Sequence, residues 1–175
     1  MRKEWDTQHS HPRMLQHSGE RSPMKILVDA DACPVKHIIE RIAKEHKIPV
    51  IMVIDTSHIL QSDYSEILQV SKAPEAVDIA LINRTSAGDI VVTQDYGVAS
   101  MALGKKAYAI NQNGRYYTED NIDCLMFERH IAKKQRRAGK KTSSIKKRTK
   151  ENDENFERAF LQLCLRLKQG SSQPE

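Results

Sequence analysis

The sequence lacks the features that would place the protein in a membrane or in an oxidising compartment. No apolar run approaches the roughly 20 residues that a membrane-spanning helix needs. Its three cysteines, Cys33, Cys124 and Cys164, are widely separated and form no C-x-x-C pair, which argues against a disulfide framework and a structural zinc site. We therefore predict a cytoplasmic protein with no membrane partner, and 175 residues are enough for one domain with some tail.

Acidic residues are absent from one segment of the chain. Residues 129–150 contain eleven Lys or Arg and no Asp or Glu, whereas the other residues hold 17 basic against 23 acidic side chains. Such a segment is typical of a surface that binds a polyanion, so we predict nucleic acid, RNA in particular, as a partner. A solvated charged tail is the alternative. The residues that we expect to contact phosphate groups are Arg115, Lys133, Lys134, Arg136, Arg137, Lys140, Lys141, Lys146, Lys147 and Arg148.

Aromatic residues are also scarce, at 5% of the chain, so few side chains can stack on bases. Tyr116 and Tyr117 stand beside Arg115. This pair indicates either a base-stacking platform or one buried and one exposed ring on an extended segment.

The most informative stretch is residues 24–34, M-K-I-L-V-D-A-D-A-C-P. Its continuous Ile-Leu-Val run favours a strand buried on both faces of a parallel sheet, and Pro34 is typical of the first turn of a following helix. Asp29 and Asp31 then lie at the carboxyl end of the strand, where open α/β sheets bind ligands. Two carboxylates there indicate a divalent metal or phosphate chemistry. The alternative is that Asp31 caps the helix and Asp29 is a solvated loop acid.

Apolar patterning predicts that strands and helices alternate along the chain. Four further strands are expected at 50–54, 67–70, 90–93 and 107–110. Helices are expected after the first, third and fourth strands and from Thr118, and a polar loop at 55–65 is expected to join the second and third strands. The alternation predicts an α/β fold in three layers, a parallel sheet with helices on both faces. Right-handed crossovers restrict the layouts that five strands can adopt. If the chain winds outward through strands two and three and then places strand four on the other side of strand one, the order is 3-2-1-4-5, and strands one and four flank the topological switch point.

Three further carboxylates are expected at the same edge of the sheet. Asp95 follows the fourth strand, and Glu75 and Asp78 start the helix after the third strand. Like charges this close raise one another's pKa unless a cation compensates them. We therefore predict that Mg²⁺ or Mn²⁺ is held by Asp29, Asp31, Glu75, Asp78 and Asp95 and activates a water molecule. The alternatives are a turn acid at 95 and favourable helix-start charges at 75 and 78.

Three segments carry a resemblance to a known family: V-D-A-D-A-C-P-V-K at 28–36, G-D-I-V-V-T-Q-D-Y-G-V-A-S at 88–100 and G-R-Y-Y-T-E-D-N-I at 114–122. Over roughly residues 24–165 the chain resembles the YaiI/YqxD family of uncharacterised bacterial PIN-like domain proteins. The resemblance implies a PIN-like domain with a 3-2-1-4-5 sheet, and PIN-like relatives are typically Mg²⁺- or Mn²⁺-dependent nucleases. Asp29 and Asp31 match its first acidic motif, Asp78 its helix aspartate and Asp95 its T-x-D aspartate. Glu75 stands where the family usually has Asp.

The predicted domain organisation follows from these patterns. Residues 1–23 are polar and are expected to form a disordered extension; the codons of Gly19-Glu20 can supply a ribosome-binding sequence, which makes Met24 an alternative start. The PIN-like domain covers 24–138 and a flexible basic segment covers 139–152. Apolar side chains at helical spacing predict an amphipathic helix at 153–168 that either packs on the domain or makes a homodimer contact. Residues 169–175 are expected to be a disordered tail.

The leading functional prediction is a metal-dependent nuclease that hydrolyses phosphodiester bonds, with Asp29, Asp78 and Asp95 as catalytic residues and the basic segment holding the phosphate backbone. One alternative is a non-catalytic nucleic-acid-binding protein with the same fold. A second is a haloacid-dehalogenase-like phosphatase that uses Asp29 as the nucleophile and Asp31 as the acid and base, although Cys33 and Pro34 fit that motif poorly.

Overall fold

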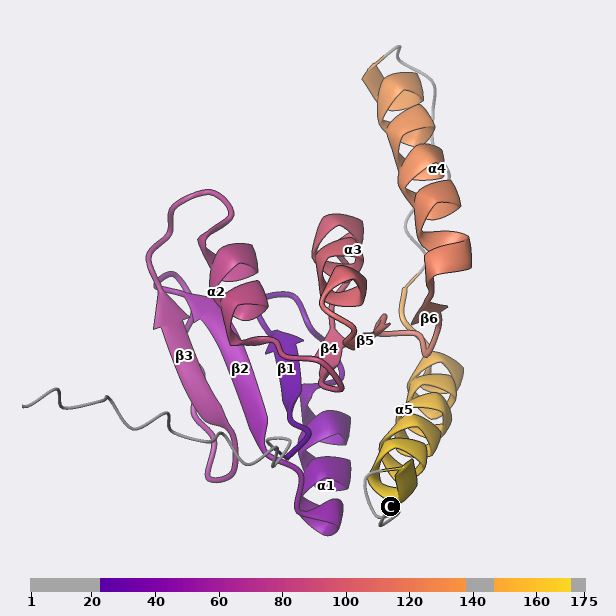
Figure 1. The fold of residues 1–175 in the computed structure, drawn as a ribbon. Helices are drawn as coiled ribbons and strands as arrows, with labels where there is room; N and C mark the ends of the chain where they lie inside the picture. The colour runs from indigo at the N-terminus through magenta and orange to yellow at the C-terminus, as the bar shows by residue number, and fades with distance from the viewer. Residues whose placement is uncertain (1–22, 138–146, 171–175) are drawn as a thin grey trace, which may run out of the picture.

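The computed structural model describes residues 23–137 and 147–170, except for the side chain of Arg136. Nearly all of the expected extension at 1–23, most of the basic segment at 139–152 and the last residues of the tail fall outside the described residues. The elements are, in chain order, β1 (Ile26–Asp29), α1 (Lys36–His46), β2 (Val50–Asp55), β3 (Glu66–Val70), α2 (Ala76–Arg84), β4 (Ile90–Val92), α3 (Tyr96–Gly104), β5 (Tyr108–Ile110), β6 (Tyr116–Tyr117), α4 (Glu119–Arg137) and α5 (Lys150–Gly170) (Figure 1).

A six-stranded sheet of order β3-β2-β1-β4-β5-β6 forms the centre of the fold. Its first five strands pair in parallel, and β6 pairs antiparallel with β5. The predicted α/β class and the order 3-2-1-4-5 are therefore confirmed. We did not predict β6, because a strand of two tyrosines is too short to show an alternating pattern.

Side chains that alternate along the strands divide the core into two layers. In β1, Ile26 and Val28 pack with α1 and α5, whereas Leu27 packs with α2 and α3 on the other face. Because both faces are covered, the strand is apolar throughout, as expected for a parallel sheet between helices. The sheet and its two helical layers form the three layers of a PIN-like fold (Figure 1).

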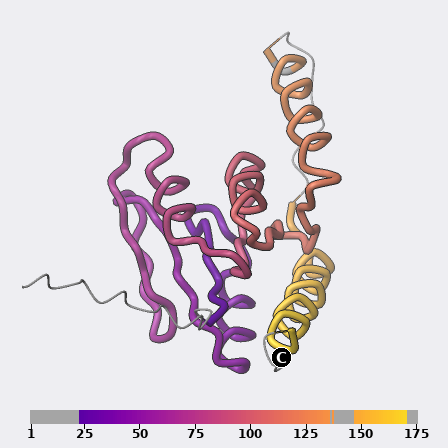
Figure 2. The backbone as a smooth tube through the Cα atoms, in the orientation of Figure 1, coloured from indigo at the N-terminus to yellow at the C-terminus, as the bar shows by residue number. Residues whose placement is uncertain are grey.

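The C-terminal helix α5 is part of this core. Phe156, Phe160, Leu163 and Cys164 are at most 1% exposed. Each buried phenylalanine stabilises the fold by about 1.5 to 3 kcal/mol. The helix runs alongside α1 (Figure 2), so of the two arrangements considered for the C-terminal helix, packing on its own domain is the one observed.

The turn between β5 and β6 holds the beginning of α5. Gly114 in this turn has a φ of 83°, and a Cβ at this position would lie 2.7 Å from the carbonyl oxygen of Asn155. The hydroxyl of Tyr116 donates to the carbonyl oxygen of Ala159 over 2.6 Å. Only glycine permits this close approach between the turn and the helix.

Helix α4 projects away from the sheet (Figures 1 and 2). Ile122 and Leu125, in its first half, are buried in the layer that contains α3, whereas Phe127 is 65% exposed. The helix therefore leaves the domain with most of its surface in solvent. Within the described ranges, no helix combines the length and hydropathy that a membrane crossing requires.

Candidate metal centre and nucleic-acid interface

Asp29 ends β1 at the carboxyl edge of the sheet. Its Oδ2 accepts a hydrogen bond from Oγ1 of Thr93 over 3.1 Å. Burial raises the pKa of Asp29 above its ordinary value of 3.8, the hydrogen bond from Thr93 opposes this effect, and the charges of Asp78, Asp31 and Asp95 raise the pKa further. Three of the other four predicted carboxylates therefore lie close enough for their charges to act on Asp29.

Two of the predicted acids lie at the start of helix α2. Asp78 lies in its first turn, and Glu75 occupies the N-cap position. Burial raises the pKa of Asp78, and the charges of Asp95 and Glu75 raise it further. Glu75 has a φ of 61°, a left-handed conformation that costs a side-chain-bearing residue about 1 to 2 kcal/mol. Backbone strain of this kind is common at functional sites.

Asp95 is the N-cap of α3. Its Oδ1 accepts hydrogen bonds from the backbone N–H groups of Gly97 and Val98, at 2.7 and 3.1 Å, and its Oδ2 lies 3.1 Å from Nη1 of Arg129. Burial acts to raise the pKa of Asp95, but the two N–H donors and Arg129 outweigh it, so the pKa falls below 3.8. The helix start thus keeps Asp95 ionised, whereas Asp29 and Asp78 shift in the opposite direction.

Asp31 turns toward the end of β2. Its Oδ1 accepts a hydrogen bond from the N–H of Asp55 over 3.2 Å and lies 3.1 Å from Nδ1 of His58. One oxygen of Asp55 is also 3.1 Å from this nitrogen, and hydrogen bonds from Ser57 lower the pKa of Asp55 to about 2. The ligand atoms of Asp31, Asp55 and His58 all lie within 4.8 Å of one another, an arrangement compatible with a metal site.

The alternative role of Asp31 as a helix cap is wrong. The N-cap position of α1 is Val35, and no side chain caps this helix. The capping carboxylate at this edge is Asp95 instead. The sequence pattern cannot tell whether Asp31 or Asp95 caps a helix, because each follows a strand and precedes a helix.

The predicted phosphate-binding residues have different surroundings. Those that the structure shows as exposed are Arg115, Lys133, Lys134, Arg137 and Lys147. Lys140, Lys141, Lys146 and the side chain of Arg136 lie outside the described residues. The tyrosines next to Arg115 form no open platform, because Tyr117 is only 3% exposed.

Arg148 differs from the other basic residues because its guanidinium makes three contacts inside the domain. Its Nε lies 2.6 Å from Oδ1 of Asp153, its Nη1 donates to Oδ1 of Asn113 over 2.9 Å, and its Nη2 donates to the carbonyl oxygen of Gln112 over 2.7 Å. These bonds tie the beginning of α5 to the β5–β6 turn. Arg148 thus has a structural role and is poorly placed to contact phosphate as well.

Three residues of the site were not predicted from the sequence. Asp55 is the last residue of the buried strand β2 just as Asp29 is the last residue of β1, so the rule that found Asp29 applies equally to Asp55. His58 lies one turn further along the same loop. Arg129 belongs to the basic segment, but its contact with Asp95 joins positions 34 residues apart and has no local signal.

The donor chemistry of this edge fits a hard divalent cation. Asp29, Asp31, Asp78 and Asp95 offer carboxylate oxygens, the ligands that Mg²⁺ and Mn²⁺ prefer, and these cations keep several waters as further ligands. Burial raises the pKa of both Asp29 and Asp78, and the charges of neighbouring carboxylates raise the two pKa values further, so a cation at this edge would favour their ionised forms.

Comparison with known proteins agrees with the motifs and the fold. The family model described as "Uncharacterized BCR, YaiI/YqxD family" matches residues 27–166. The chain is 64% identical over 143 residues to a UPF0178 protein of Lachnoclostridium phytofermentans, covering 80% of this chain and 96% of that protein. It is 59% identical over 147 residues to a UPF0178 protein of Clostridium acetobutylicum, covering 83% of this chain and 99% of that protein. No solved structure matches. The chain belongs to the YaiI/YqxD family.

Proposed function

We propose that the protein is a metal-dependent nuclease that hydrolyses phosphodiester bonds of RNA, with Mg²⁺ or Mn²⁺ held by Asp29, Asp31, Asp78 and Asp95. The observation that carries the proposal is the convergence of Asp29, Asp78 and Asp95 at one sheet edge, where their charges act on one another. When these carboxylates are ionised and no cation is bound, their repulsion destabilises the folded protein. Such destabilising groups are common where carboxylates bind a ligand or take part in catalysis.

The residues around the carboxylates prepare them for this role. Thr93 donates to one oxygen of Asp29 and restrains its rotation. The N–H groups of Gly97 and Val98 fix one oxygen of Asp95 and keep the group ionised. A divalent cation bound here would supply an activated water and would neutralise charge that develops on the phosphodiester. Glu75 stands at the rim and adds its charge to that of Asp78.

Helix α4 supplies a basic surface that leads to this edge. Arg129, Lys133 and Arg137 recur every four residues, which places them on one face of the helix. The first of them reaches Asp95, and two surface cavities of about 240 and 460 Å³ adjoin Arg129 and Tyr96. These three residues form a basic stripe along α4. A phosphate backbone that follows this stripe would be guided to the carboxylates.

The test is cleavage of single-stranded RNA and DNA with Mn²⁺ or with EDTA, by the wild-type chain and by Asp29→Asn. Asp63→Asn is the matched control, because Asp63 is exposed and lies in the loop before β3. We expect Mn²⁺-dependent cleavage of RNA by the wild type and the control, reduced at least a hundredfold in Asp29→Asn. Cleavage that persists in EDTA or in Asp29→Asn contradicts the mechanism. Binding without cleavage by the wild type would leave the non-catalytic alternative.

A further inference from the structure

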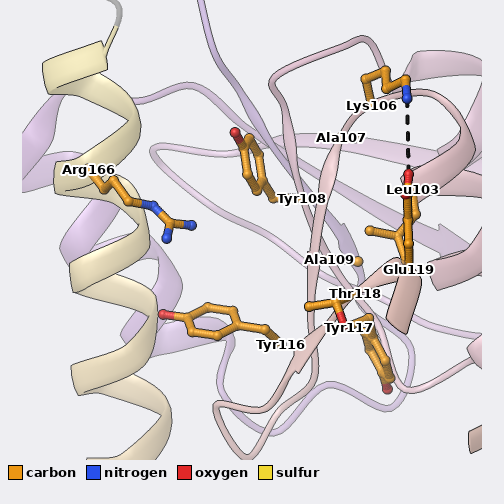
Figure 3. A pocket seen from close by; sticks show the side chains of 10 residues that line it. All are labelled: Leu103, Lys106, Ala107, Tyr108, Ala109, Tyr116, Tyr117, Thr118, Glu119 and Arg166. Atoms are coloured by element: carbon orange, nitrogen blue, oxygen red, sulfur yellow. Dashed lines mark ion pairs between the residues drawn. The ribbon is translucent and has the colours of Figure 1, made fainter. Parts of the chain in front are cut away.

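Another cavity lies at the edge of the sheet formed by β5 and β6 (Figure 3). Its volume is about 450 Å³, within the range of about 300 to 1,000 Å³ that is typical of small-molecule sites. Three of the five tyrosines of the chain line it, namely Tyr108, Tyr116 and Tyr117. Because aromatic residues make up only 5% of the chain, this concentration of tyrosines distinguishes the cavity from the rest of the surface.

The strand register explains how two of these rings come together. Ile110 lies opposite Tyr116 in the β5–β6 pair, and Tyr108 lies two residues before Ile110. Tyr108 and Tyr116 therefore project from the same face of the sheet as diagonal neighbours, the face that α5 covers. Tyr108 is 39% exposed, so part of its surface is open to a ligand.

Arg166 reaches toward these rings from α5 (Figure 3). Its Cζ lies 5.8 Å from the centre of the Tyr108 ring, and its charge also acts on the hydroxyl of Tyr116. Among the residues that the structure describes, none forms an ion pair or a hydrogen bond with this guanidinium, so its N–H donors are open to an anion. A guanidinium presents these donors in a planar fork that matches the oxygens of a phosphate.

Lys106 is a second cation among the residues that line the cavity. Nζ of Lys106 lies 4.0 Å from Oε1 of Glu119, and both side chains are 79% exposed. A pair this exposed contributes little stability and separates easily.

We propose that this cavity binds one nucleotide, with its base against Tyr108 and its phosphate on Arg166. Aromatic rings next to a cation are the combination that binds single-stranded nucleic acid through base stacking and phosphate pairing. The cavity is separate from the carboxylate edge, because Tyr108 pairs with Ile90 at the beginning of β4, whereas Asp95 follows the other end of that strand. The inference goes beyond the proposed nuclease and does not require cleavage.

The test is titration of the full-length protein in EDTA with adenosine monophosphate, adenosine, inorganic phosphate and a four-nucleotide RNA. We expect the monophosphate to bind more tightly than adenosine or phosphate alone. Arg166→Gln should weaken the monophosphate about tenfold and leave adenosine unchanged. Tyr108→Leu should weaken both the monophosphate and adenosine about fivefold or more. Tighter binding of the RNA than of the monophosphate identifies a polymer segment as the ligand, and equal binding identifies a free nucleotide.

Arg158→Gln is the matched control, since Arg158 is an exposed arginine on the same helix and does not line the cavity. It should bind every ligand as the wild type does. Arg166 and Tyr108 are exposed, so both variants should keep the unfolding midpoint of the wild type. The inference is overturned if the wild type binds neither the monophosphate nor the RNA, or if Arg166→Gln and Tyr108→Leu bind them as tightly as Arg158→Gln. Because EDTA removes divalent cations, failure of the nuclease proposal does not alter this result.

Discussion

Nη1 of Arg129 lies 3.1 Å from Oδ2 of Asp95 and thereby joins the basic helix α4 to the acidic edge of the sheet. The guanidinium also lies over the ring of Tyr96, with its Cζ 5.4 Å from the ring centre. These contacts join the middle of α4 to the start of α3. They also place the beginning of the basic stripe beside the carboxylates that are proposed to hold the metal.

Arg129→Gln should weaken RNA binding and leave the fold intact, because the side chain is about half exposed. Each phosphate contact that is lost reduces the slope of log affinity against log salt by about 1. The measurement is RNA affinity at several salt concentrations, without divalent cations. Arg84→Gln is the control, since Arg84 pairs with Glu66 on the β3 side of the sheet. An unchanged salt slope in Arg129→Gln would place the RNA elsewhere.

Asp29→Asn should stabilise the metal-free protein at neutral pH. Because burial and the neighbouring carboxylates raise the pKa of Asp29, its ionised form opposes folding, and this penalty is present above the raised pKa. The advantage of the variant should shrink as the pH falls through that pKa and vanish below 3.8, where Asp29 is protonated in both the folded and the unfolded state. Thermal unfolding of both proteins from pH 3.5 to 8 in EDTA measures this difference in stability. A less stable variant at pH 7 would show that the carboxylate is compensated within the protein.

The same variant should lose stabilisation by Mn²⁺. A ligand that binds only the folded state raises stability by about 2.7 kcal/mol at a concentration one hundred times its dissociation constant. We expect Mn²⁺ to raise the unfolding midpoint of the wild type and of Asp63→Asn, but not that of Asp29→Asn. An equal shift in all three proteins would mean that the cation binds away from Asp29.

Substitutions at Asp95 separate its capping role from its charge. Asp95→Ala should destabilise the protein by about 1 kcal/mol, because the N–H groups of Gly97 and Val98 lose their acceptor. Asp95→Asn keeps a good N-cap and should lose far less stability, yet both variants should lose nuclease activity. Denaturant unfolding and RNA cleavage measure the two effects. Full activity in Asp95→Asn would show that the residue is only a cap.

Glu75→Gly should relieve backbone strain at the cost of metal affinity. Glycine adopts the left-handed conformation that Glu75 holds at φ 61° without a steric penalty, so we expect a gain in stability of up to about 1 kcal/mol. Loss of the carboxylate should weaken Mn²⁺ binding. Denaturant unfolding in EDTA and Mn²⁺ titration distinguish the two results, and unchanged Mn²⁺ affinity would remove Glu75 from the site.

Much of the fold and part of the site follow from local sequence. The apolar runs predict the strands, and the right-handed crossover rule predicts their order, because both depend on chain chirality and on burial of short segments. Asp29 and Asp95 are recognisable because each follows a buried strand. Asp55 satisfies the same rule and was missed because residues 55–65 were assigned as a single polar loop, although Asp55 is the last residue of β2. Strand β6 was missed because a strand of two residues has no periodicity.

The sequence by itself determined the layered α/β fold, the edge of the sheet at which the carboxylates gather and the separation of acidic and basic charge along the chain. Only the tertiary structure decided which acid caps a helix, that Arg129 contacts Asp95, that Arg148 is bound within the domain and that Arg166 faces Tyr108. The physical reason is the distance along the chain over which each kind of interaction acts. Burial and helix or strand periodicity act over a few neighbouring residues, whereas these contacts join side chains that approach only after the sheet has formed and α5 has packed against it.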